Sequence, residues 1–145
     1  MTLTAKPLTV GVPRETKTEE HRVAITPDGT RAVSVSNDSS VRVWSLNQPD
    51  DGRKLDGHFA AVYAVALTPD GSMAITGGRD RSVRVWNLAS GESRWMTGHG
   101  GAVIGVAVTP DGKLAVSTDW AGVLRVWDVA AAECLRVLRG HTLPV

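Results

Sequence analysis

Three polar residues, His58, Thr76 and Asp80, are of the types that build a hydrolytic triad, in which an acid orients a base and the base activates a hydroxyl nucleophile. The same residue types also form hydrogen-bonded braces inside folded domains, where a fully satisfied polar network makes the structure rigid. The choice between catalysis and bracing depends on the elements that position the three side chains.

The residues that could hold a metal or a cofactor do not have the spacing of such sites. Residues 98–105 contain the glycines of a dinucleotide loop, but such a loop follows a strand and opens a helix, and no segment of helical period comes next. The single cysteine, Cys134, lies in a predicted strand, and we interpret it as a packing residue. No Cys or His pair has the short spacing of a zinc site. Four histidines recur at a near-constant interval instead: His21, His58, His99 and His141. The sequence therefore predicts neither a metal nor a cofactor.

The histidines belong to a longer repeat that is anchored by tryptophan. Trp44, Trp86 and Trp127 end similar Val/Leu-Arg-Val-Trp segments and are 42 and 41 residues apart. A fixed period in this range is typical of repeat architectures. Gly-His occurs three times, and Thr-Pro-Asp-Gly begins 18 residues before each tryptophan, at residues 26–29, 68–71 and 109–112.

Each repeat predicts four short strands. An apolar run such as residues 62–67 ends at the Pro-Asp-Gly turn, where Pro presets φ and Gly accepts a positive φ. A second apolar strand follows at residues 73–76. The segment at residues 83–86 alternates apolar and charged side chains, which is the period of a strand. A weaker fourth strand covers residues 93–96. The chain is therefore predicted to be all-β.

This frame of Gly-His, Pro-Asp-Gly, Asp and Val-Arg-Val-Trp resembles the WD-repeat family of β-propellers over residues 22–141. The resemblance implies four-stranded antiparallel blades arranged round a channel. It also implies a scaffold that binds proteins or peptides and has no chemistry of its own. We expect an N-terminal segment and three blades, followed by the start of a fourth: residues 1–21, 22–57, 58–98, 99–140 and 141–145.

The N-terminal segment carries a second resemblance. Residues 8–27 are similar to the opening of alanine dehydrogenases and proton-translocating transhydrogenases, in which the arginine equivalent to Arg22 helps to hold a carboxylate. The resemblance ends at Gly29, and no βαβ unit follows it. Two accounts stay open: a dehydrogenase-like piece joined to blades, or an outer strand without a blade of its own. The alternative function is thus a truncated or fused relative of those enzymes without a complete active site.

The WD-repeat resemblance gives the polar trio a structural role. In the family, the Gly-His histidine, a Ser or Thr, a turn Asp and the repeat Trp form a buried network that braces one blade. All four members are present in the second repeat, which we expect to be the stiffest: His58, Thr76, Asp80 and Trp86.

The other two repeats carry partial networks. The first has Ser34, Asp38 and Trp44, with Thr16 at the histidine position. The third has His99, Ser117 and Trp127, with Ala121 at the position of the turn aspartate. Asp119 lies two residues earlier, so we expect its carboxylate to point elsewhere and the turn round Ala121 to be loosened.

A partner site is expected at one rim of the blades. In the family the turn before the repeat tryptophan faces the side on which partners dock. Aromatic and arginine side chains are enriched among the residues that dominate binding energy. The rim residues are Tyr63, Arg79, Ile104 and Trp120. An equally weighted alternative for Trp120 is that it covers a gap beside Ala121.

Composition excludes several classes of partner. Apolar residues make up 42% of the chain and charged residues 21%, which is typical of a globular domain. A net charge of +1 gives no reason to expect a nucleic-acid or membrane partner. Residues 1–13 contain no apolar stretch that is long enough for a signal peptide, so the expected location is the cytoplasm.

Three blades do not close a ring, because propellers have about four to eight blades. We expect open ends that expose Val23, Ile25 and Val33 on one side and Val106, Val108 and Val116 on the other. Terminal repeats without caps expose apolar faces, which favours head-to-tail association. A homodimer would supply six blades, so the expected oligomer is a dimer.

Overall fold

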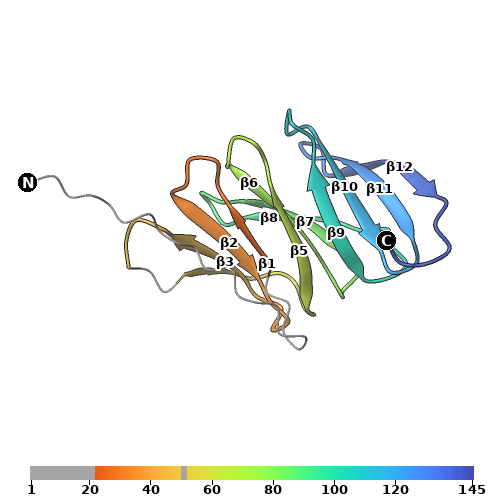
Figure 1. Cartoon of the computed structure of the whole chain (residues 1–145), viewed down its shortest axis with the longest axis horizontal. Helices are drawn as coiled ribbons and strands as arrows, with labels where there is room; N and C mark the ends of the chain where they lie inside the picture. The colour runs from red at the N-terminus through yellow and green to blue at the C-terminus, as the bar shows by residue number, and fades with distance from the viewer. Residues whose placement is uncertain (1–21, 50–51) are drawn as a thin grey trace, which may run out of the picture.

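The computed structural model describes residues 22–49 and 52–145, and every regular element in these ranges is a β-strand. The strands form three four-stranded sheets that lie side by side in chain order (Figure 1). The first sheet contains β1 (Arg22–Ile25), β2 (Arg31–Val35), β3 (Val41–Ser45) and β4 (Arg53–Leu55). The second contains β5 (Val62–Leu67), β6 (Met73–Gly78), β7 (Val83–Asn87) and β8 (Ser93–Met96). The third contains β9 (Val103–Val108), β10 (Leu114–Asp119), β11 (Val123–Asp128) and β12 (Glu133–Arg139).

Each sheet is an antiparallel meander in which every strand pairs with its neighbour in the chain. Among the first strands of the sheets, β5 contacts both β1 and β9, so the three strands line one side of the row. The predicted all-β segment of three antiparallel sheets, unable to close a ring alone, is confirmed. The expected N-terminal segment, residues 1–21, lies outside the described residues.

The Pro-Asp-Gly turns repeat the same geometry in all three sheets. The glycines have positive φ angles of 68°, 70° and 73°, a conformation that L side chains rarely adopt. In the second sheet, Asp70 accepts hydrogen bonds from the Thr68 hydroxyl at 2.6 Å and the Ser72 amide at 3.0 Å. These hydrogen bonds lower the pKa of Asp70 to about 2. The carboxylate therefore fixes the turn between the first two strands of the sheet.

The sheets pack through two chemically different faces. In the second sheet, Ala74, Thr76 and Trp86 lie on one side, which we call the tryptophan face. Ile75, Val83 and Val85 lie on the opposite side with Met96, and we call this the valine face. The two faces arise because successive side chains of a strand point to opposite sides of the sheet.

Each core joins the valine face of one sheet to the tryptophan face of the next. The first core packs Val33, Val35, Val41, Val43 and Leu55 against Val62, Ala74, Trp86 and Leu88. The second packs Ile75, Val83, Val85 and Met96 against Val103, Ala115, Trp127 and Val129. The second and third sheets therefore each turn their tryptophan face toward the preceding sheet.

This direction corrects the residues expected at the two open ends. Val33 is fully buried, because it pairs with Ala24 and Val43 and faces the second sheet. Val106 and Val108 pack against the second core. The expectation treated all strand valines at an end as equivalent, whereas alternation along the strand places them on opposite faces. Val23 and Ile25 are exposed as expected, at 48% and 44%.

Candidate functional site

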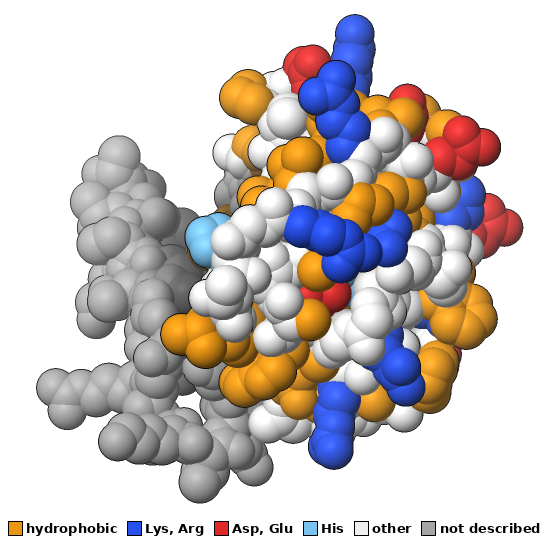
Figure 2. Space-filling view, turned by 90° about the vertical axis from the view of Figure 1, so that its right-hand side faces the viewer, with side chains coloured by type: hydrophobic (Ala, Val, Ile, Leu, Met, Phe, Trp, Pro, Cys, Tyr) orange, Lys and Arg blue, Asp and Glu red, His pale blue; other side chains and the backbone are white. Residues whose placement is uncertain are grey.

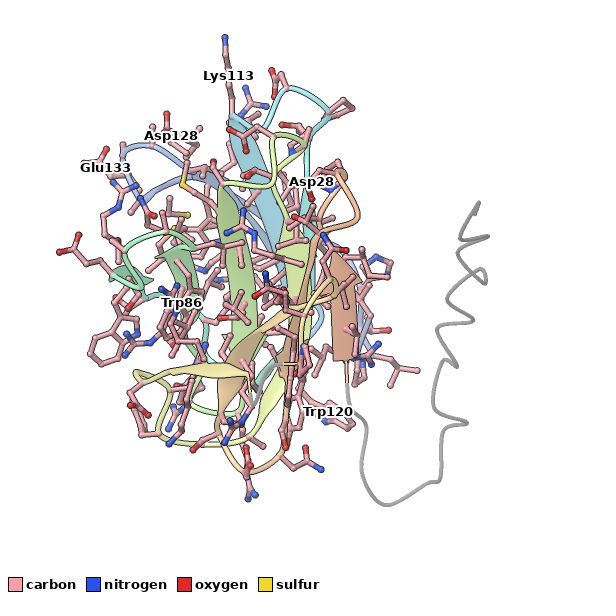
Figure 3. The ribbon with its side chains drawn as sticks, turned by 90° about the vertical axis from the view of Figure 1, so that its left-hand side faces the viewer. Asp28, Trp86, Lys113, Trp120, Asp128 and Glu133 are labelled. Atoms are coloured by element: carbon pink, nitrogen blue, oxygen red, sulfur yellow. The ribbon has the colours of Figure 1, made fainter. Side chains whose placement is uncertain are left out.

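The second sheet positions the polar trio as one connected network. His58 Nδ1 lies 2.7 Å from Asp80 Oδ2, and His58 Nε2 lies 2.7 Å from the Thr76 hydroxyl oxygen. Trp86 Nε1 donates to the same hydroxyl oxygen at 2.8 Å. Thr76 and Asp80 come from β6 and the turn after it, and Trp86 comes from β7. Figure 3 shows Trp86 among the strands of the molecule. The structure thus brings all four residues together.

The partners fix the direction of each hydrogen bond. Indole nitrogen only donates, so Thr76 accepts from Trp86 and uses its own proton toward His58 Nε2. His58 Nδ1 then carries the ring proton and donates to Asp80. Burial alone would raise the pKa of Asp80, but the hydrogen bonds from His58 and Ser82 outweigh it and lower that pKa to about 2. With this pattern, each polar side-chain atom of the trio has a hydrogen-bond partner.

The network is closed to solvent. The side chains of His58 and Asp80 are 0% exposed, and Thr76 is 0% exposed. The threonine hydroxyl is buried and already donates to the histidine. The arrangement therefore braces the sheet, and the triad chemistry suggested by the residue types has no access to a substrate in this structure.

The third sheet contains the same network with a different acid. His99 Nδ1 lies 2.8 Å from Asp119 Oδ2, and His99 Nε2 lies 2.6 Å from the Ser117 hydroxyl. Trp127 Nε1 donates to Ser117 at 2.7 Å. The expectation that Asp119 would point elsewhere is wrong. Ser117 and Asp119 are two residues apart on β10, so both side chains lie on the face that carries His99.

Asp119 also holds the turn that was expected to be loose. Its Oδ1 accepts from the amides of Ala121 and Val123, each at 3.0 Å. Burial would raise the pKa of Asp119, but these amides and His99 together lower it. The turn round Ala121 is therefore anchored by the last residue of β10 instead of by a residue within the turn.

The first sheet has part of the network within the described residues. Trp44 Nε1 donates to the Ser34 hydroxyl at 2.8 Å. Asp38 is exposed and accepts from the Ser40 amide at 2.8 Å, so it fixes the turn without meeting a histidine. Thr16, at the histidine position, lies outside the described residues.

Acidification should destabilise the protein through His99. Burial is the main cause that lowers the pKa of His99 below its ordinary value of 6.5, and Asp119 offsets it in part. Because the unfolded chain takes up this proton first, the stability that depends on neutral His99 is full above about pH 6.5 and falls as the pH drops below it. Urea unfolding midpoints between about pH 7.5 and pH 5 measure this loss. The midpoint of His99→Gln should fall less steeply with pH than that of the parent, and equal slopes would contradict the assignment.

The rim residues lie together in part. Tyr63, Ile104 and Trp120 line a cavity of about 430 Å³ together with Arg22 and Val145. Trp120 is 64% exposed. Figure 3 places Trp120 at the end of the molecule opposite to Asp28 and Lys113, which belong to the Pro-Asp-Gly turns. The cavity thus opens at the rim away from those turns.

Arg79 occupies the matching position in the second sheet but is not among the residues that line the cavity. The Arg79 amide donates to the Ala61 carbonyl at 2.7 Å, and the Trp120 amide donates to the Ala102 carbonyl at 2.9 Å. The two residues therefore have equivalent backbone positions at the same end of neighbouring sheets. Arg79 is exposed and follows β6 of the second sheet, but its side chain does not line the cavity.

Two sets of side-chain contacts were not predicted from the sequence. An exposed aromatic pair, Phe59 and Trp95, meets edge to face at 6.1 Å, and the Arg84 guanidinium lies 5.0 Å from the Trp95 ring. Arginines of the outer strands also bridge neighbouring sheets: Arg53 donates to the carbonyls of Leu88 and Ala89, and Arg94 to those of Val129 and Ala130. The second pattern has a sequence signal, because Arg53 follows Trp44 by nine residues and Arg94 follows Trp86 by eight.

Neither a metal-binding cluster nor a membrane-crossing helix occurs among the described residues. No group of three His, Cys, Asp or Glu side chains in residues 22–49 and 52–145 has an arrangement that could hold a metal ion. The same part of the chain contains no helix with the length and hydropathy needed to cross a bilayer.

Comparison with known proteins finds one matching family model and many similar structures. The model described as WD domain, G-beta repeat matches residues 18–45, 51–87 and 92–128. A solved structure titled "Structure of U3-55K" superposes with a TM-score of 0.76 at 29% sequence identity. The alignment covers 84% of this chain and 39% of that one, so this chain spans about two fifths of that protein's length. No curated protein matches the chain. The resemblance of residues 8–27 to alanine dehydrogenases receives no support from these matches.

Proposed function

Because this chain belongs to the WD-repeat family, we propose that it is a non-catalytic scaffold that binds a protein or peptide at its rim. The observation that carries the proposal is the cavity that joins Tyr63, Ile104 and Trp120. These residues come from β5, from β9 and from the turn after β10, and Arg22 of the cavity wall comes from β1, so all three sheets contribute to one site.

The chemistry of the cavity favours an apolar anchor. Ligand sites in proteins are concave and mostly apolar, with a few polar groups that fix orientation. Tyr63 and Ile104 are half-buried and form walls of the cavity. The exposed indole of Trp120 supplies contact area at its opening. Aromatic residues in such positions carry much of the binding energy of interfaces. A peptide that inserts one apolar or aromatic side chain fits this site.

Rigid positioning supports the same role. The Trp120 amide is held by Ala102, and the neighbouring Asp119 is tied to His99 and to the turn amides. A rigid site loses little conformational entropy on binding, which favours affinity. The buried network of the third sheet would thus serve the rim indirectly, by fixing the turn that carries Trp120.

Selection from a random peptide library displayed on phage tests the proposal. The parent protein should enrich peptides with a shared apolar position, and the double variant Tyr63→Ala, Trp120→Ala should bind the selected peptides at least about tenfold more weakly, the loss expected for a buried aromatic anchor. The matched control is Phe59→Ala, Trp95→Ala, which removes two exposed aromatic rings away from the cavity. Equal binding by the parent and the rim variant would refute the rim site. The single variant Arg79→Ala decides whether that residue contributes beside the cavity.

A further inference from the structure

The third sheet ends the row with a valine face on which no described sheet packs. Five positions of this face can be matched by register to the two faces that are covered. In the first sheet they are Val33, Val35, Val41, Val43 and Leu55. In the second sheet they are Ile75, Gly77, Val83, Val85 and Met96. In the third sheet they are Val116, Thr118, Leu124, Val126 and Leu138.

Burial separates the third set from the other two. All positions of the first and second sets are buried, and their exposed fractions do not exceed 7% where they are hydrophobic. All positions of the third set are at least partly exposed, and Leu138 reaches 47%. Figure 2 looks onto this side of the molecule and shows hydrophobic side chains beside those of Lys and Arg. The third sheet therefore presents the same surface that its neighbours bury.

The molecule itself shows what covers such a surface. Both covered valine faces meet the tryptophan face of a following sheet. The first sheet carries a tryptophan face of its own, with Trp44 half-buried. Val23 and Ile25 on that face are exposed at 48% and 44%, whereas their register equivalents Val65 and Leu67 pack against the first core. The exposed tryptophan face of the first sheet is thus of the kind that covers a valine face elsewhere in the molecule.

A polar contact repeats at the same interfaces and is available for a third one. Arg53 and Arg94 extend from the valine face to the two carbonyls that follow the next repeat tryptophan by two and three residues. Arg136 is the register equivalent, because it pairs with Val126 as Arg53 pairs with Val43, and it is exposed. The equivalent carbonyls on the first sheet belong to Leu46 and Asn47. The apolar contacts and the arginine contact therefore both pair the valine face of the third sheet with the first sheet.

We propose that the valine face of the third sheet binds the tryptophan face of the first sheet in a second copy of this chain, with Arg136 donating to the carbonyls of Leu46 and Asn47. The contact is heterologous, so two copies close on themselves when each gives one end and receives the other. Two copies supply six sheets, within the range of about four to eight blades that closed propellers have. The proposal is independent of the rim cavity.

Light scattering after gel filtration tests the assembly. The parent should have twice the 15.4 kDa mass of one chain. Val126→Asp places a charge on the valine face and Ile25→Asp places one on the tryptophan face, so each variant alone should be a monomer. An equimolar mixture should form a 1:1 dimer, because each variant keeps the end that the other lacks. Phe59→Asp, a charge on an exposed side chain outside both faces, should remain a dimer.

Each alternative gives a different result. A monomeric parent overturns the proposal. A dimer that persists in either single variant also overturns it, because such a dimer would be formed by one face against the same face of the second copy. Circular dichroism checks that the variants fold. If Val126→Asp does not fold, Arg136→Glu replaces it, because this exposed side chain can change without disturbing a core. A dimer of Arg136→Glu as tight as the parent contradicts the assigned contact.

Discussion

Replacing Asp80 with alanine should lower the free energy of unfolding by about 2–3 kcal/mol, the range for leaving a buried polar group without its partner. The variant removes the 2.7 Å acceptor of His58 Nδ1 at a side chain that is 0% exposed, and leaves only the Ser82 hydroxyl at 3.3 Å. It also removes the acceptor of the Ser82 amide and hydroxyl, at 3.1 and 2.7 Å. Urea unfolding followed by circular dichroism measures the loss.

The control for this prediction is an aspartate that lies on the surface. Asp56 pairs with Lys54 at 2.9 Å, and its side chain is 80% exposed. Exposed ion pairs contribute about 0–1 kcal/mol, so Asp56→Ala should change stability by less than about 0.5 kcal/mol. Similar losses for Asp80→Ala and Asp56→Ala would mean that the buried network does not brace the second sheet.

The repeat made most of the fold predictable. Trp44, Trp86 and Trp127 set the period, and the alternation round them identifies the third strand of each sheet. The turn geometry followed from Pro-Asp-Gly, because only a few residue types accept the φ angles that the turn needs. These signals are local, so they survive without knowledge of the tertiary structure.

The direction of the sheets was less accessible. The sequence shows that Val33 and Val43 are apolar, but only their strand pairing shows that they point toward the second sheet. Likewise, Val106 is apolar on a face that packs against the second sheet, whereas Val116 is apolar on a face against which no described sheet packs. Which side is covered depends on the order of packing, which no single strand encodes.

The rim was predictable by register but not by shape. Tyr63, Ile104 and Trp120 could be placed at one end of the sheets from their distance to the repeat motifs. Arg79 has the same backbone position as Trp120, yet the cavity does not include it. Cavity walls depend on how neighbouring sheets diverge, and this property arises only when the sheets are packed.

Asp119 shows how the frame of counting decides an assignment. Counting back from Trp127 puts Ala121 at the position that Asp80 occupies before Trp86. Counting along the strand from Ser117 instead puts Asp119 on the same face two residues later, where Gly78 follows Thr76 in the second sheet. The hydrogen bond from His99 to Asp119 shows that the second frame applies. A carboxylate can therefore reach the histidine from the strand end as well as from the turn.

Asp119→Ala should destabilise the protein by about 2–3 kcal/mol, because it leaves His99 and the turn amides of Ala121 and Val123 without their acceptor. The side chains of His99 and Asp119 are both 1% exposed, so water does not replace the lost carboxylate. The loss is measured by urea unfolding, as for Asp80→Ala, and the two variants should be similarly destabilised.

A second substitution separates the strand-end acid from the turn acid. Ala121→Asp introduces a carboxylate at the position that Asp80 uses in the second sheet. In the parent this carboxylate should add no stability, because Asp119 already accepts the proton of His99. In the Asp119→Ala background it should recover at least about half of the loss, by giving the buried imidazole a new acceptor. If Ala121→Asp stabilises the parent, or if Asp119→Ala causes no loss, then Asp119 is not the acceptor of the His99 proton, because only a histidine without an acceptor gains from a second carboxylate.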